Sequence, residues 1–199
     1  MPAAQLEVLH PPSAETTDGE LVERARAGEQ WALEMLYRRH VGLVAATSRR
    51  LLRNAVEAED VVQETFMLAF ERLTQLQDPM AIRGWLARIA MSRVHKRWRW
   101  QKVRGWLGHA TPTEETLASQ ADPGASPEVR AELTLLDRVL SALPHKLRAV
   151  WVLRHVVGHT VEDTAAACGC SMATVKRRLG AAEEIVQDHL QDGSEVRDV

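Results

Sequence analysis

The stretch TVEDTAAACGCSMATVKRRLGAA, residues 160–182, has the pattern of a helix-turn-helix. Thr160 can cap a short first helix, and Asp163 lies three residues later, where it can complete a capping box. Gly169 tolerates the positive φ that a tight turn between two helices requires, and Ser171 can cap the second helix. Residues at helical spacing then keep one face of the second helix apolar: Val175, Leu179, Ala182 and Val186.

The opposite face of the second helix carries Lys176, Arg177 and Arg178. A basic helix of this kind suits the major groove of DNA, where cationic side chains reach phosphates and guanine edges. The alternative is an ordinary helical hairpin with a solvated basic face. The segment therefore favours DNA binding but does not establish it alone.

The composition is that of a globular protein of one large or two small domains, with 199 residues of which 45% are hydrophobic. The two cysteines, Cys168 and Cys170, are one residue apart with no second pair, so neither a zinc site nor a disulfide framework is expected. Cys168 is better explained as a small apolar residue between the two helices. No stretch has the length of a transmembrane helix and no signal peptide is evident, so we expect a cytoplasmic protein without membrane insertion.

The net charge of −2 conceals a strong segregation of charge along the chain. Residues 88–104 hold seven basic side chains and no acidic one, and residues 133–182 hold seven basic against three acidic. Residues 105–132 contain five acidic side chains and one basic, and the residues after 182 contain six acidic and one basic. Two basic segments separated and flanked by acidic ones indicate two surfaces that face nucleic acid.

The pattern of apolar residues predicts an all-α fold of two small helical domains joined by a flexible linker, the C-terminal one a helix-turn-helix. Besides the helix-turn-helix, helical spacing extends over six segments: 20–27, 29–53, 55–76, 81–101, 128–143 and 144–158. Pro, Ser, Thr and Ala dominate 111–127 and indicate the linker. The chain is expected to divide into five parts: a disordered arm 1–17, a helical domain 18–105, a flexible acidic linker 106–127, a helix-turn-helix domain 128–191 and an acidic tail 192–199.

A second constellation is the acidic segment EDVVQE at residues 59–64. Asp60, Gln63 and Glu64 are spaced i, i+3 and i+4, so they share one face of a helix. Clustered acids on one helix repel one another, and this repulsion must be offset. The face is either an ordinary solvated surface or a docking surface for a basic or amide-rich partner.

A third constellation interleaves tryptophans with the basic residues that follow position 88. Indole rings stack on unpaired bases while cations hold the backbone, as in proteins that grip single-stranded nucleic acid. Trp98 and Trp100 cannot both face inward, because they are two residues apart on a helix. The alternative, a Trp packed under Arg side chains for structural reasons alone, remains open. The residues expected to act on nucleic acid here are Arg88, Arg93, Lys96, Arg97, Arg99 and Trp100.

Signs of catalysis are scarce in this sequence. No glycine-rich phosphate loop, G-x-S-x-G or H-E-x-x-H motif occurs. His155 and His159 are four residues apart, but Gly158 lies between them at the expected end of a helix. We therefore expect neither enzymatic activity nor a catalytic residue, a metal, a cofactor or a small-molecule substrate.

In order and spacing, these constellations make the chain similar to an extracytoplasmic-function (ECF) sigma factor of the sigma-70 superfamily. The resemblance extends over about residues 18–190. The segments that carry it are ELVERARAGEQWALEMLYRRH at 20–40, AVEAEDVVQETFMLAFERL at 55–73, IRGWLARIA at 82–90, LSALPHKLRAVWVLRHVVGHTVED at 140–163 and ATVKRRL at 173–179.

The resemblance implies a bacterial promoter-recognition subunit whose partners are core RNA polymerase, promoter DNA and an anti-sigma factor. Asp60, Gln63 and Glu64 match the positions that dock onto the polymerase clamp helices. The loop near 75–83 and the helix from Trp85 onward would read and melt the −10 element. The C-terminal domain would read the −35 element with the second helix of its helix-turn-helix, where the expected contacts are Ser171, Thr174, Lys176, Arg177 and Arg178.

The sequence departs from the family pattern at several of these positions. Met91 and Ser92 replace the usual Arg-Asn of the melting helix, and Lys96 stands where an acidic residue is common. Residues 180–184, GAAEE, replace the basic continuation of the recognition helix. These differences bear on how the chain contacts DNA rather than on its class.

Two other functions remain as alternatives. A stand-alone helix-turn-helix repressor or activator could dimerise through its N-terminal helices, but it would need neither the acidic face at 59–64 nor the basic Trp-rich helix. An enzyme acting on nucleic acid would need a carboxylate or metal constellation that the sequence does not suggest. Run-off transcription with core polymerase separates the three.

Overall fold

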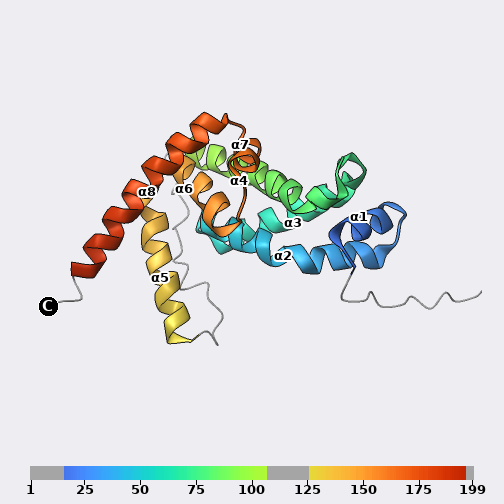
Figure 1. Cartoon of the computed structure of the whole chain (residues 1–199), viewed down its shortest axis with the longest axis horizontal. Helices are drawn as coiled ribbons and strands as arrows, with labels where there is room; N and C mark the ends of the chain where they lie inside the picture. The colour runs from blue at the N-terminus through green and yellow to red at the C-terminus, as the bar shows by residue number, and fades with distance from the viewer. Residues whose placement is uncertain (1–15, 107–125, 196–199) are drawn as a thin grey trace, which may run out of the picture.

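The computed structural model describes residues 16–106 and 126–195, and every regular element in these ranges is helical (Figure 1). The all-α prediction is therefore confirmed. In chain order the elements are α1 (Asp18–Arg26), α2 (Gln30–Leu52), α3 (Ala55–Glu71), η1 (Leu73–Gln75), η2 (Pro79–Ala81), α4 (Ile82–Trp106), α5 (Pro127–Ala142), α6 (His145–Trp151), η3 (Val152–Val156), α7 (Val161–Cys168) and α8 (Met172–Glu195).

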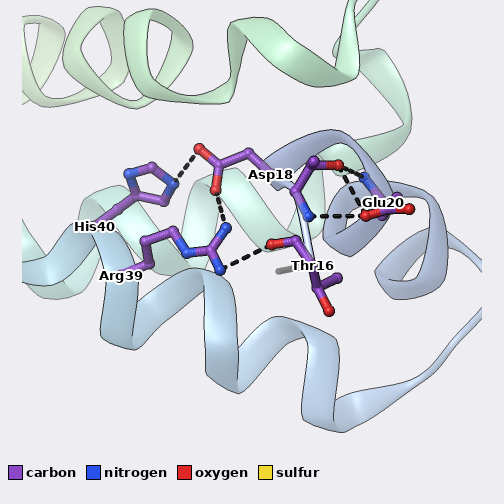
Figure 2. A network of polar contacts seen from close by, with 6 residues as sticks. Thr16, Asp18, Glu20, Arg39 and His40 are labelled. Atoms are coloured by element: carbon purple, nitrogen blue, oxygen red, sulfur yellow. Dashed lines mark hydrogen bonds and ion pairs between the residues drawn. The ribbon is translucent and has the colours of Figure 1, made fainter. Parts of the chain in front are cut away.

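Helix α1 is anchored at its first turn by a network of polar contacts (Figure 2). Thr17 caps the helix, and Glu20 returns a hydrogen bond to the Thr17 backbone, which completes a capping box. Asp18 links the helix to α2, because its carboxylate lies 2.7 Å from Arg39 and 3.1 Å from buried His40. The start of α1 is thereby fixed against the middle of α2.

The core of the N-terminal half, α1 to α4, forms because each helix presents an apolar stripe inward. Fully buried side chains from all four helices meet in this core, among them Leu21, Leu36, Val61, Leu86 and Met91. Arg26 of α1 donates to the backbone carbonyls of Leu73 and Leu76, so it holds the loop after α3 against the bundle. This loop leads into α4 through Asp78, whose side chain caps η2.

The C-terminal half contains the predicted helix-turn-helix. Thr160 caps α7 in a capping box with Asp163, and Gly169 adopts the left-handed conformation at φ 62° that ends the helix. The side chain of Ser171 accepts a hydrogen bond from the backbone N–H of Thr174 at the start of α8. Helices α5 and α8 contact each other and then diverge as they project away from the rest of the fold (Figure 1).

The two predicted domains pack against each other, although a small buried cluster of Val150, Ala165 and Val175 belongs to the C-terminal half alone. One continuous cluster of buried apolar residues extends from α1 through α4 into α5, α6, η3, α7 and α8. Helix α7 packs on α4, and α6 and η3 pack on α2. The sequence predicts two domains but contains no sign of this contact, because the residues that make it have ordinary helical patterns within each half.

Several expected boundaries shift when the structure is compared with the sequence. Thr16 and Thr17 belong to the α1 anchor rather than to the arm, and α8 continues to Glu195, past the expected start of the acidic tail. Ser126 caps α5 and Pro127 is its first residue, so this helix begins within the expected linker. Residues 1–15 of the arm, most of the linker (107–125) and the end of the tail (196–199) lie outside the described residues.

Candidate nucleic-acid and protein interfaces

The acidic row on α3 is at the surface, as its spacing predicts. The side chains of Asp60 and Glu64 are 58% and 41% exposed, and Gln63 is exposed between them. Val61 and Phe66 point into the core, so the helix is amphipathic and its acidic row is available from outside.

The acidic row pairs with the basic helix. Arg97 of α4 approaches Glu64 at 2.9 Å and Asp60 at 3.6 Å, and Arg93 lies 3.9 Å from Glu64. The hydrogen bond from Arg97 holds the pKa of Glu64 below its usual value. Carboxylates on α3 and cations on α4 thus offset the repulsion within each helix. The cationic charge of α4 therefore does not by itself require a nucleic-acid partner.

A hollow of about 350 Å³ opens between α3 and α4 beside these ion pairs. Gln101 donates to Glu57 at 2.9 Å across it, and Trp100 stands at its edge with 59% of its surface exposed. Lys96, at a position where the family favours an acid, lines the same hollow and balances the α3 carboxylates. Trp100 thus lies beside the acidic row rather than apart from it.

A second, larger hollow, here called the loop groove, lies between the end of α3, the η1–η2 loop and one face of α4. Its volume is about 580 Å³. Arg88 and Arg93 contribute positive charge to it, Trp85 contributes an aromatic ring, and Ser92 a hydroxyl group. The full lining is Leu68, Arg72, Gln75, Leu76, Gln77, Asp78, Ala81, Trp85, Arg88, Ile89, Ser92 and Arg93.

The remaining expected residues of α4 divide between surface and interior. Arg99 and Arg88 are exposed, and Trp100 is exposed while Trp98 turns inward, which confirms that the two tryptophans cannot share a face. The ring of Trp98 stacks on His145 of α6 with 4.8 Å between ring centroids. The side chains of Arg104 and Trp106 lie outside the description, although both residues are in α4.

The basic face of α8 is presented from the helix-turn-helix. Ser171, Lys176 and Arg177 are exposed, and Thr174 contacts the hydroxyl of Ser171 at 2.9 Å. Arg178 is half-buried and points its guanidinium at the sulfur of Cys170, 3.7 Å away. Met172 at the start of the helix is also exposed, so the first turns of α8 present polar, basic and apolar side chains to solvent.

The two cysteines do not form a reactive or metal-binding pair. Cys168 packs against the core at the α7–α8 junction, and burial raises the pKa of its thiol to about 12. Within residues 16–106 and 126–195, no three His, Cys, Asp or Glu side chains gather as metal ligands. Over the same ranges, no helix combines the length and the hydropathy that crossing a bilayer requires.

The loop near 75–83 and the helix from Trp85 onward, both expected from the sequence, supply most of the lining of the loop groove, but the sequence analysis missed Leu68 and Arg72 there and the contacts that join the two halves. Leu68 and Arg72 lie at the end of α3, outside the segments expected to contact DNA, and Arg53 and Asp137 pair although 84 positions separate them. One local feature of the sequence marks the position of Arg53. It precedes Asn54, a good cap for α3, and in the structure it ends α2 in the left-handed conformation.

Comparison with known proteins matches both halves of the fold. Residues 36–104 match the family Sigma-70 region 2, and residues 133–184 match Sigma-70, region 4. RNA polymerase sigma factor CnrH of Cupriavidus metallidurans is 30% identical over 187 residues, which is 91% of this chain and 98% of CnrH. The ECF RNA polymerase sigma-E factor of Haemophilus influenzae is 30% identical over 192 residues, which is 88% of this chain and 96% of that protein.

A solved structure, that of CnrH in complex with the cytosolic domain of CnrY, aligns with 88% of this chain and 97% of the CnrH chain. The TM-score is 0.64 and the sequence identity is 27%. The matches to both sigma-70 regions define a transcription initiation factor, a class of protein that is not enzymatic. The chain belongs to the sigma-70 family, and within it is an RNA polymerase sigma factor of the ECF type, with regions 2 and 4 for promoter recognition.

Proposed function

We propose that this sigma factor docks onto core RNA polymerase through Asp60, Gln63 and Glu64. These residues lie in one exposed row on α3, within the segment that matches region 2. A row of carboxylates and an amide suits a partner surface rich in Arg and Lys. Because Glu64 already pairs with Arg97, docking exchanges an internal ion pair for an intermolecular one.

The loop groove and the exposed face of α4 are the proposed site for the −10 element. The groove brings Arg88, Arg93 and the ring of Trp85 to one hollow, which suits an unpaired base with its phosphate. Arg99 and Trp100 extend the site along α4. Lys96 and Arg97 face α3, so their role at the promoter depends on release from the carboxylates there.

The first turns of α8 are the proposed reader of the −35 element. Lys176 and Arg177 are exposed where the helix would enter a major groove, and Ser171 and Thr174 lie at its N-terminal end, where phosphate contacts are common. Arg178 is proposed as a phosphate contact next to them. On this account residues 18–105 carry polymerase docking and −10 opening, and residues 128–191 carry −35 recognition.

We further propose that this sigma factor acts in the cytoplasm, where core polymerase is found, and that an anti-sigma protein controls it. The aligned CnrH structure contains the cytosolic domain of CnrY, and its fold is shared over most of the present chain. Such an anti-sigma protein would inhibit this sigma factor by covering one of the proposed polymerase or DNA surfaces.

The observation that carries the proposal is the exposed acidic row within the region 2 match. Its test is the variant Asp60→Ala, Gln63→Ala, Glu64→Ala, assayed for binding to core polymerase. A matched control removes two carboxylates and one amide at the same spacing from the surface of α8: Glu184→Ala, Gln187→Ala, Asp188→Ala. We expect a sharp loss of polymerase binding for the α3 variant alone, and equal binding by both variants would reject the docking role.

A further inference from the structure

Helix α1 contacts η1 and η2, the two short helices of the loop that lines one side of the loop groove. At the C-terminal end of α1, Arg26 donates from Nε and Nη2 to the backbone carbonyl of Leu73, at 3.3 and 3.2 Å, and from Nη2 also to that of Leu76. Near the N-terminal end of α1, Gly19 lies against η2, where a Cβ would come within 2.8 Å of the Sδ atom of Met80. One helix therefore supports the loop at two points.

The guanidinium of Arg26 is oriented by the helix that carries it. Its third nitrogen, Nη1, donates to the carboxylate of Glu23 at 2.7 Å, one turn earlier in α1. The side chain of Arg26 is only 21% exposed. All three nitrogens are thus engaged, and the planar fork of an Arg suits a bridge between two carbonyls in a way that the single ammonium group of a Lys does not.

Helix α1 is itself held in place by α2 and by the core. Asp18 lies 2.7 Å from Arg39 and 3.1 Å from His40 at the first turn of α1 (Figure 2). Leu21 is fully buried in the core. Because its first turn and its apolar face are both fixed, α1 gives Arg26 a firm base from which to hold the loop.

The segment that Arg26 holds presents polar side chains to the loop groove. Gln75 lies between the two bonded carbonyls and Gln77 just after them, and both side chains are exposed and line the groove. Their amide groups can donate to and accept from the edge of an unpaired base. The turn that carries Gln75 is a 3₁₀ helix of three residues, in which hydrogen-bond geometry is poorer than in an α-helix, so its conformation depends on support from outside.

We propose that Arg26 is a positioning residue for recognition of the −10 element, which holds Gln75 and Gln77 where they read an unpaired base in the loop groove. Among the described residues, the groove lining includes none from α1, so Arg26 acts through the loop and not by contact with DNA. Residues 18–26 precede the segment 36–104 that matches region 2, and the match assigns no role to them. The inference rests on the proposed −10 site but not on docking through α3.

Hydrogen exchange in the free, full-length protein tests whether Arg26 holds the loop. The test variant is Arg26→Gln, and the control is Arg24→Gln, which removes a cation from the same helix but one that pairs with Glu29 instead of the loop. We expect the amides of residues 73–78 to exchange several-fold faster in Arg26→Gln alone, because local opening of this segment then costs less. Equal exchange in the two variants would overturn the support by Arg26. Arg26→Lys keeps the charge without the fork and should show a smaller change in the same direction, which keeps the test available if Arg26→Gln fails to fold.

Base selection is measured with holoenzyme assembled from each variant and core polymerase. Open complexes are isolated from a pool of duplex promoters that is randomised across the −10 element, and their DNA is sequenced. For Arg26→Gln we expect the preference at one or two −10 positions to fall about five-fold or more, which is the discrimination that one good base contact supplies. Gln75→Ala or Gln77→Ala should lose preference at the same positions, and Arg24→Gln should retain the wild-type pattern.

The pattern of preference separates positioning from a merely structural role. A helix that only stabilised the fold would, when weakened, lower the yield of open complexes without changing which bases are selected. Wild-type preference at every position in Arg26→Gln, or an equal loss at all positions, would therefore overturn the positioning role. An unmodified holoenzyme without any −10 preference would instead reject the −10 site, and with it the role of Arg26 there. The two failures are distinct, because hydrogen exchange is measured without polymerase or DNA.

Discussion

The ion pair between Glu64 and Arg97 should make a measurable contribution to stability. The two side chains are 2.9 Å apart, with Glu64 41% and Arg97 14% exposed. Exposed pairs contribute about 0.2–1 kcal/mol and hydrogen bonds to charged groups about 1.5–3 kcal/mol. Because solvent screens the half-exposed carboxylate, we expect a coupling energy of about 1 kcal/mol, at the upper end of the range for exposed pairs.

A double-mutant cycle with Glu64→Gln and Arg97→Gln, followed by urea unfolding, measures this coupling. A parallel cycle with Glu59→Gln, exposed on the same helix, is the control and should give coupling near zero. The pKa of Glu64 is lowered from 4.5 in the folded protein, so the coupling should be complete above that value and disappear as pH falls through the folded pKa. No coupling at neutral pH, or coupling that survives protonation, would refute the pairing.

Three further predictions concern single side chains. Gly169→Ala should destabilise the protein by about 1–2 kcal/mol in a thermal melt, because φ is 62° at this position. The space for a Cβ is open, so the cost comes from the backbone conformation alone, and an unchanged melting temperature would contradict it. Lys176→Ala should reduce the log–log salt slope of duplex binding by about one unit if Lys176 contacts a phosphate, and relax preference at one base pair if it reads a guanine. Burial lowers the pKa of His159 from 6.5 despite the nearby Asp163, so the free energy of unfolding should fall as pH drops below about 6.5. The variant His159→Gln should reduce this dependence of the unfolding free energy on pH, measured by unfolding curves from about pH 7 to 5.

Local patterns in the sequence predict much of this fold. The caps at Thr160 and Ser171, the turn at Gly169 and the apolar stripe of α8 correspond to features that depend on residues close together in the chain. The same holds for the exposure of the acidic row, since the spacing of Asp60, Gln63 and Glu64 fixes their common face.

Contacts between distant residues escaped the sequence analysis for a physical reason. The anionic partner of Arg97 is α3 of the same chain, and sequence spacing cannot reveal which helices lie side by side. The pairing of Arg53 with Asp137 has no local periodicity either, because each residue sits on an otherwise ordinary helix. The segregation of charge in the sequence was real, but part of it is neutralised within the fold rather than at an interface.

The central claim is that α3 docks the polymerase while α4 opens the promoter. Transcription from a promoter selected in vitro with this protein and core polymerase tests it, when each variant is compared on duplex and on pre-melted template. The α4 variant is Arg88→Gln, Arg99→Gln, Trp100→Ala, which leaves the Glu64–Arg97 pair in place; the α3 variant is Asp60→Ala, Gln63→Ala, Glu64→Ala. We predict that the pre-melted template restores transcription by the α4 variant but not by the α3 variant. Rescue of both, or of neither, would contradict this division of roles.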